Sequence, residues 1–217
     1  LLEEIVGRLQ QKPFPLDEAM NYVLTYEIEK GKYPTVFQVA GRIGEIGLQM
    51  NLQAVCADYE DRVIFDIIDT DIETKSYQFK YSRNKSIEVL TTKGIQIAEY
   101  DDLILVDNLP VVFEVKLSNK GGKSPGCKMA GRGSSSKALS YFLGEEKVAR
   151  IFRPLQEYFG TSSCGYVIIA FPERCILSTT VKQEFVNSGG LLVPFPLSRK
   201  QYLSLLLDRF QSGWISS

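Results

Sequence analysis

The sequence predicts an α/β domain in which helices flank a mixed central sheet and a short helical segment precedes it. Two apolar runs, 103–106 and 111–115, flank a turn-forming segment at 107–110, which predicts two adjacent strands. The near-continuous apolar run at 165–171 is typical of a strand buried on both faces. Residues 138–158 have helical periodicity, and a long crossover helix between two strands predicts a parallel pair.

The elements on either side of this central part follow from the same kinds of pattern. Apolar residues recur at helical spacing near the N-terminus, which predicts helices at 1–10, 16–28 and 35–53. Short apolar stretches predict further strands at 62–68, 77–81 and 87–90. The C-terminal part is predicted to form a helix at 181–186, a strand at 191–193 and a helix at 198–210 with Ser198 as its N-cap. We therefore divide the chain into a helical N-terminal extension, 1–34, and an α/β domain, 35–217.

Composition fits a globular protein but gives no sign of its partner. The chain has 217 residues, of which 44% are hydrophobic, so it can bury a substantial core. Its formal net charge is -1, so any surface that binds nucleic acid must be local. No apolar run approaches the roughly 20 residues of a membrane span, and the N-terminus lacks the pattern of a signal peptide. We expect a cytoplasmic protein that does not contact a membrane.

The residue types present restrict the chemistry. The sequence contains no histidine, which excludes Ser-His-Asp and Cys-His nucleophilic sites and histidine-based metal sites. Its four cysteines are far apart and lack CxxC spacing, so we expect reduced thiols rather than a zinc site or a disulfide framework. Catalysis would have to use carboxylates, lysine and a hard cation that prefers oxygen ligands.

Charged residues gather at the ends of the two central strands. Asp101 and Asp102 open the first strand, and Glu114 and Lys116 close the second. Because strand side chains alternate, Glu114 and Lys116 share a face, about 7 Å apart along the strand. Charges at the end of an apolar strand are costly to bury without a partner or a metal, so this group is a candidate site.

This arrangement resembles the PD-(D/E)XK nuclease superfamily, which has the restriction-endonuclease-like fold. The matching stretches are Glu-Tyr-Asp-Asp at 99–102, followed by an apolar strand, and Phe-Glu-Val-Lys at 113–116. In that family the aspartate and the glutamate hold magnesium, and the lysine positions or activates the attacking water. Either Asp101 or Asp102 aligns with the family aspartate, and the proline that usually precedes it is absent. The resemblance implies Mg²⁺ as cofactor, with Mn²⁺ as a substitute.

The third predicted helix has three interpretations. Its polar face contains Glu45, and in the nuclease fold a helix beside the sheet sometimes contributes a glutamate to the metal site. A helix-turn-helix that reaches about residue 57 is an alternative, because Ala40 and Gly44 have the spacing typical of that motif. The third interpretation is an amphipathic helix with a solvated polar face.

A basic segment follows the second central strand. It is rich in Gly and Ser and contains no acidic residue, and its cations are Lys120, Lys123, Lys128, Arg132 and Lys137. Beside a metal site, such a loop would hold the phosphate backbone of DNA. A solvated loop without that role is the alternative.

Taken with the family resemblance, these features predict a metal-dependent nuclease that hydrolyses phosphodiester bonds in DNA, in repair, recombination or restriction. The predicted partners are DNA and, as an option, a second copy of the chain in a homodimer. Two other functions remain open: a DNA-binding regulator that uses a helix-turn-helix, and an inactive nuclease-like subunit of an assembly.

Overall fold

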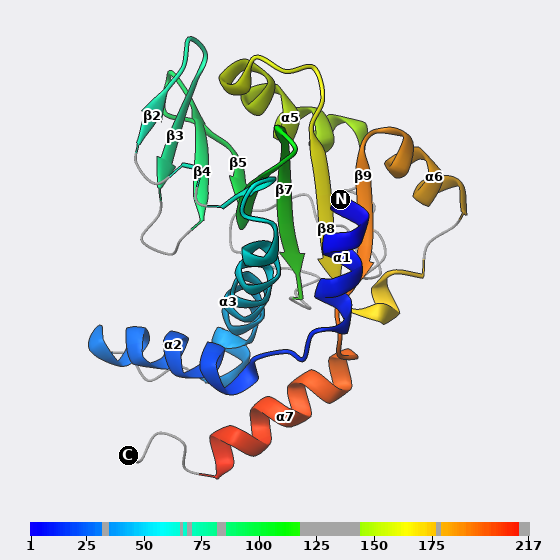
Figure 1. The fold of residues 1–217 in the computed structure, drawn as a ribbon. Helices are drawn as coiled ribbons and strands as arrows, with labels where there is room; N and C mark the ends of the chain where they lie inside the picture. Colours follow the sequence, from blue (N-terminus) through cyan, green and yellow to red (C-terminus); the bar gives the residue numbers. More distant parts are fainter. Residues whose placement is uncertain are drawn as a thin grey trace, which may run out of the picture.

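The computed structural model describes residues 1–31, 35–65, 67–68, 71–81, 86–117, 144–176 and 179–212. Within these residues the strands form two sheets, and the helices pack against them (Figure 1). The architecture is mixed α/β, with helices flanking a mixed sheet, as the sequence predicts. No helix in this part of the chain combines the length and the apolar character that crossing a bilayer would need.

The larger sheet has five strands and carries most of the predicted core. Their order is β1 (Val63–Ile64), β6 (Asp102–Val106), β7 (Leu109–Lys116), β8 (Gly165–Ala170) and β9 (Gly190–Pro194). The pairs β1–β6 and β6–β7 are antiparallel, whereas β7–β8 and β8–β9 are parallel. The predicted parallel pair on either side of a crossover is therefore confirmed.

The smaller sheet was not predicted as a separate layer. It is an antiparallel meander of β2 (Ile72–Glu73), β3 (Tyr77–Tyr81), β4 (Ile87–Thr91) and β5 (Gln96–Tyr100), and it lies beside the upper part of β7 (Figure 1). Strands β2 and β5 were not predicted, because both mix polar with apolar residues and so lack a continuous apolar run. The strand predicted at 62–68 was too long, since β1 is the only strand among the described residues of that stretch, 62–65 and 67–68.

The β6–β7 hairpin has a tighter turn than predicted. Asp107 and Asn108 are the only two residues between the paired positions Val106 and Leu109, and their φ angles are 50° and 65°. Positive φ at both positions is typical of a type I′ turn, which Asp and Asn tolerate better than other non-glycine residues. Pro110 therefore lies in β7, opposite Leu105.

One face of the five-stranded sheet borders a core that four helices help to form. These are α1 (Leu2–Gln11), α2 (Leu16–Glu29), α3 (Val36–Cys56) and α7 (Arg199–Gln211). They share one apolar core with residues of β6, β7 and β8 that include Ile104, Phe113 and Ile169. Because α3 is one continuous helix, no turn of a helix-turn-helix lies within 36–53. The N-terminal helices are thus part of the main core.

The opposite face packs against α5 (Glu145–Phe159), α6 (Thr179–Asn187) and the smaller sheet. Leu103, Val112 and Ile168 supply its apolar surface, and Ile151 of α5 and Phe185 of α6 are fully buried against it. The helix predicted at 138–158 begins at Glu145 within the described residues, and its first predicted residues lie outside them.

The C-terminal elements α6, β9 and α7 begin and end within two residues of their predicted bounds. Two short 3₁₀ helices, η1 (Ala57–Tyr59) and η2 (Pro172–Arg174), follow α3 and β8. Ser198 caps α7 through a reciprocal capping box with Gln201. Cys56, Cys164 and Cys175 are free thiols, and Cys127 lies outside the described residues.

Candidate active site

Asp101 lies where the chain passes from the smaller sheet into the larger one. It follows the last residue of β5 and precedes the first residue of β6. Its Oδ2 accepts a hydrogen bond of 2.7 Å from the backbone N–H of Val115. Asp102 pairs with Phe113 across the hairpin, so the same register continued by one residue sets Asp101 opposite Glu114, on the same face. The junction of the two sheets therefore brings Asp101 to the end of β7.

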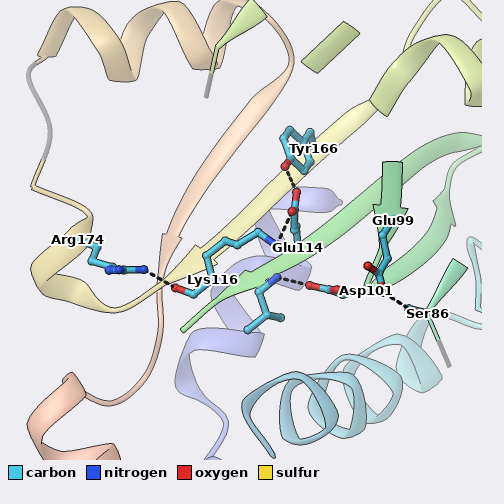
Figure 2. Close-up of polar contacts among 8 residues, drawn as sticks. Ser86, Glu99, Asp101, Glu114, Lys116, Tyr166 and Arg174 are labelled. Atoms are coloured by element: carbon cyan, nitrogen blue, oxygen red, sulfur yellow. Dashed lines mark hydrogen bonds and ion pairs between the residues drawn. The ribbon is translucent and has the colours of Figure 1, made fainter. Parts of the chain in front are cut away.

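Glu114 and Lys116 share a face, as the alternation along β7 predicts. Glu114 is only 3% exposed. Its Oε1 pairs with the ammonium of Lys116, and its Oε2 accepts a hydrogen bond from the hydroxyl of Tyr166 on β8. Figure 2 shows the Glu114 carboxylate between Tyr166 and Lys116, with Asp101 on the side toward Glu99. Both oxygens of this buried carboxylate are thus bonded.

The two aspartates that the sequence left as alternatives lie on opposite faces of the sheet. Asp102 lies on the face of Phe113, which packs against the helices of the N-terminal half. It is 5% exposed, and its charge adds to burial in raising the pKa of Cys56 at the end of α3. The structure does not bring Asp102 together with Glu114, so Asp101 is the aspartate of the candidate site.

Glu45 reaches the site from α3. It lines a cleft of about 160 Å³ together with Arg42 of the same helix and with Ser86, Glu99 and Asp101. The Ser86 hydroxyl donates to Oε1 of Glu99 at 2.8 Å (Figure 2). Of the three interpretations of the third helix, the structure therefore favours a Glu45 that takes part in the site over a fully solvated polar face.

A second cleft of about 290 Å³ meets the first at Glu99 and Asp101. Its polar walls are formed by those two residues together with Glu114, Lys116 and Lys147 of α5. The site is thus a two-part cleft that centres on Asp101 and is lined by carboxylates and by ammonium groups.

Burial and the interactions among the charged groups shift the pKa values of the side chains in this cleft. Burial raises the pKa of Glu45 to about 8, and the charge of Asp101 adds to the effect. The pKa of Asp101 rises to about 6, again chiefly through burial, although Lys116 opposes the shift. Burial lowers the pKa of Lys116, but Glu114 and Asp101 more than offset this, so the net direction is upward. Burial also lowers the pKa of Lys147. Shifts of this kind are common at functional sites.

The carboxylates do not by themselves form a closed metal cage. Within the described residues, no group of three or more Cys, Asp and Glu side chains is arranged to hold a metal ion. The ammonium of Lys116 is bound to Glu114 at the centre of the cluster. The predicted DNA-binding cations, Lys120, Lys123, Lys128, Arg132 and Lys137, lie outside the described residues and stay a prediction.

Three residues of the site were not identified from the sequence. Glu99 could have been found, because it lies two residues before Asp101 and so shares its side of an extended chain. Tyr166 belongs to an apolar run in which nothing marks a polar role, and Lys147 lies on a helix with other cations. Comparison with family models, curated proteins and solved structures finds no match for this chain. Its function must therefore be inferred from the side chains of the cleft.

Proposed function

We propose that this chain is a metal-dependent nuclease of the PD-(D/E)XK type, which hydrolyses phosphodiester bonds in DNA. The observation that carries the proposal is that Asp101, Glu114 and Lys116 line one cleft. They come from a strand junction and from the end of a neighbouring strand, the positions that the motif assigns to them.

The order of the elements supports the proposal. A long helix, α3, is followed by antiparallel strands, by the Glu-Val-Lys strand β7, by the crossover helix α5 and by the parallel strand β8. The restriction-endonuclease-like core has the same order. Likeness of fold alone does not establish an activity, so the proposal depends on the residues of the cleft.

The donor set suits Mg²⁺, with Mn²⁺ as a substitute. Glu45, Asp101 and Glu114 offer carboxylate oxygens, which are the ligands that hard divalent cations prefer. A cation among these buried carboxylates would also relieve their mutual repulsion. Asp101 and Glu114 would hold the ion, and Glu45 would add a third carboxylate from the other part of the cleft. When bound, Mg²⁺ polarises a phosphoryl oxygen and lowers the pKa of a water ligand.

The ammonium groups would act on the substrate. Lys116 would leave Glu114 to the metal and orient the attacking water or stabilise negative charge that develops on the phosphoryl oxygens. Lys147 lines the same cleft from α5 and would contact a neighbouring phosphate. Val115 would hold Asp101 in place through its backbone N–H.

The test is a cleavage assay with defined metals. Purified protein is incubated with supercoiled, linear, single-stranded or branched DNA in Mg²⁺, Mn²⁺ or EDTA. We expect cleavage in Mg²⁺ and Mn²⁺, none in EDTA, and none by a Glu114→Gln variant, which keeps the size of the side chain but removes its charge.

Two results would contradict the proposal. Cleavage that persists in EDTA would show that no divalent metal is needed. Tight DNA binding without cleavage in either metal would indicate a nuclease-like protein that lacks activity.

A further inference from the structure

Glu114 has two partners of different character. Tyr166 is fully buried in β8, and its ring packs edge-on against Phe185 with the ring centroids 5.8 Å apart. Lys116 ends β7, and its side chain is 24% exposed at the cleft. One oxygen of Glu114 is therefore bonded to a donor that the core fixes in place, and the other to a flexible side chain that borders solvent.

This division matters because a buried carboxylate needs donors to both oxygens. Were both donors flexible, the carboxylate would turn whenever a cation replaced the lysine. The hydroxyl of Tyr166 is a donor at neutral pH, because a phenol ordinarily keeps its proton until about pH 10. Hydrogen bonds from residues behind a metal ligand set its orientation and so its affinity for the ion.

We infer that Tyr166 is a positioning residue that holds Oε2 of Glu114, so that Oε1 is the oxygen that exchanges Lys116 for a divalent cation. This inference rests on the proposed function, and it assigns to the hydroxyl of Tyr166 a role in metal affinity. Tyr166 itself does not touch the metal or the substrate.

The chain offers two matched controls for a Tyr166→Phe substitution. Tyr100 is also fully buried on this side of the sheet, and its hydroxyl donates to the carbonyl of Ile151 at 2.8 Å. Tyr202 is 1% exposed on the other side, and its hydroxyl donates to the carbonyl of Ala40 at 2.6 Å. Each Tyr→Phe change removes one buried hydroxyl, but only the one at position 166 removes a donor to Glu114.

The experiment measures Mn²⁺ binding to the full chain by the electron paramagnetic resonance signal of free Mn²⁺, together with urea unfolding midpoints. We expect all three variants to show similar decreases in the unfolding midpoint, because each leaves one buried acceptor without its donor. Only Tyr166→Phe should weaken Mn²⁺ binding, by about 10- to 100-fold. Its rate of plasmid nicking should fall at low Mg²⁺ and partly recover as Mg²⁺ is raised.

The outcomes separate this inference from the proposed function. A wild-type chain that binds no Mn²⁺ would overturn both. If the wild type binds Mn²⁺ and all three variants bind it equally well, or weaken equally, Tyr166 has no positioning role although the proposed function stands. If Tyr166→Phe does not fold, Glu114→Gln is added to it. Folding restored in the double variant supports the inference, and folding lost in both overturns it.

Discussion

The two faces of the five-stranded sheet use the same strands for different purposes. On the side of α1, α2, α3 and α7, the residues that β7 presents are Val111, Phe113 and Val115, which are at most 4% exposed. On the other side β7 presents Val112, Glu114 and Lys116, so its apolar surface gives way to charge at the strand's C-terminal end. On the first face β7 contributes only apolar side chains, and the second face holds the candidate site.

The difference between the two faces shows how a buried carboxylate can be accommodated on one side of a strand while the other side keeps its apolar packing. Glu114 is as buried as its apolar neighbours, but Lys116 and Tyr166 satisfy its oxygens. An uncompensated charge at this depth would be strongly destabilising. The apolar face anchors β7, and the opposite face can then hold a perturbed group of charges. Variants that act on one face only can test this division.

The largest effect should separate Asp101 from Asp102, since these neighbours lie on opposite faces. Asp101→Asn removes a charge from the cleft but keeps an oxygen that can accept from Val115. We expect its cleavage rate to fall by about 10³-fold, because the variant would hold Mg²⁺ less well and would lose the charge stabilisation that the ion supplies. Asp102→Asn is the matched control, and its rate per folded molecule should equal that of the wild type.

Single-turnover cleavage in Mg²⁺ measures both variants, with circular dichroism to count folded molecules. Equal losses of cleavage rate in the two variants would show that the two faces of the sheet do not differ in their role in cleavage. A loss confined to Asp102→Asn would indicate that the metal binds on the face of Phe113, and that the cleft at Asp101 is not the active site.

A smaller effect is expected for Lys116→Met, which keeps much of the aliphatic stem and removes the ammonium. In Mg²⁺, cleavage should fall by about 10²-fold, because the charge beside the phosphoryl group is lost. Mn²⁺ binding should persist or tighten, since Lys116 no longer competes for Glu114. The exposed lysine Lys80 on β3 provides the control variant, Lys80→Met, which should cleave normally. If Lys116→Met cleaves as fast as wild type at equal metal concentration, the lysine is structural.

Sequence patterns predicted the part of the site that depends on the alternation of side chains between the two faces of a strand. The apolar runs at β6, β7 and β8 are strong signals, and the period of two assigns Glu114 and Lys116 to one face. These patterns do not show which of Asp101 and Asp102 faces Glu114, because a shift of one residue in register moves each aspartate to the opposite face. The register depends on the tight turn at Asp107 and Asn108, which is two residues shorter than the predicted turn at 107–110.

Long-range contacts were beyond the reach of these patterns. Glu45 precedes Asp101 by 56 positions in the sequence, and only the packing of α3 beside the sheet junction brings them to one cleft. Tyr166 forms its bond to Glu114 because β8 pairs in parallel with β7, in a register that no local pattern specifies. Strands β2 and β5 of the smaller sheet were missed for a different reason, since they alternate weakly and are partly exposed.

The smallest effect concerns Glu157, which ties α5, a helix on the side of the candidate site, to the smaller sheet. Its Oε1 accepts hydrogen bonds of 2.7 Å each from the Thr74 hydroxyl and the Ser76 backbone N–H. These bonds lower the pKa of Glu157 below its ordinary value of 4.5. A pKa that is lower in the folded state adds stability above the unfolded pKa, and this stability is lost as pH falls through the folded pKa. Glu157→Gln should therefore reduce the urea midpoint slightly at pH 7 and leave it equal to that of the wild type at pH 2. Glu184→Gln, at an exposed position on α6, is the control. A pH profile as steep in Glu157→Gln as in wild type would show that this contact does not help to hold α5 against the smaller sheet.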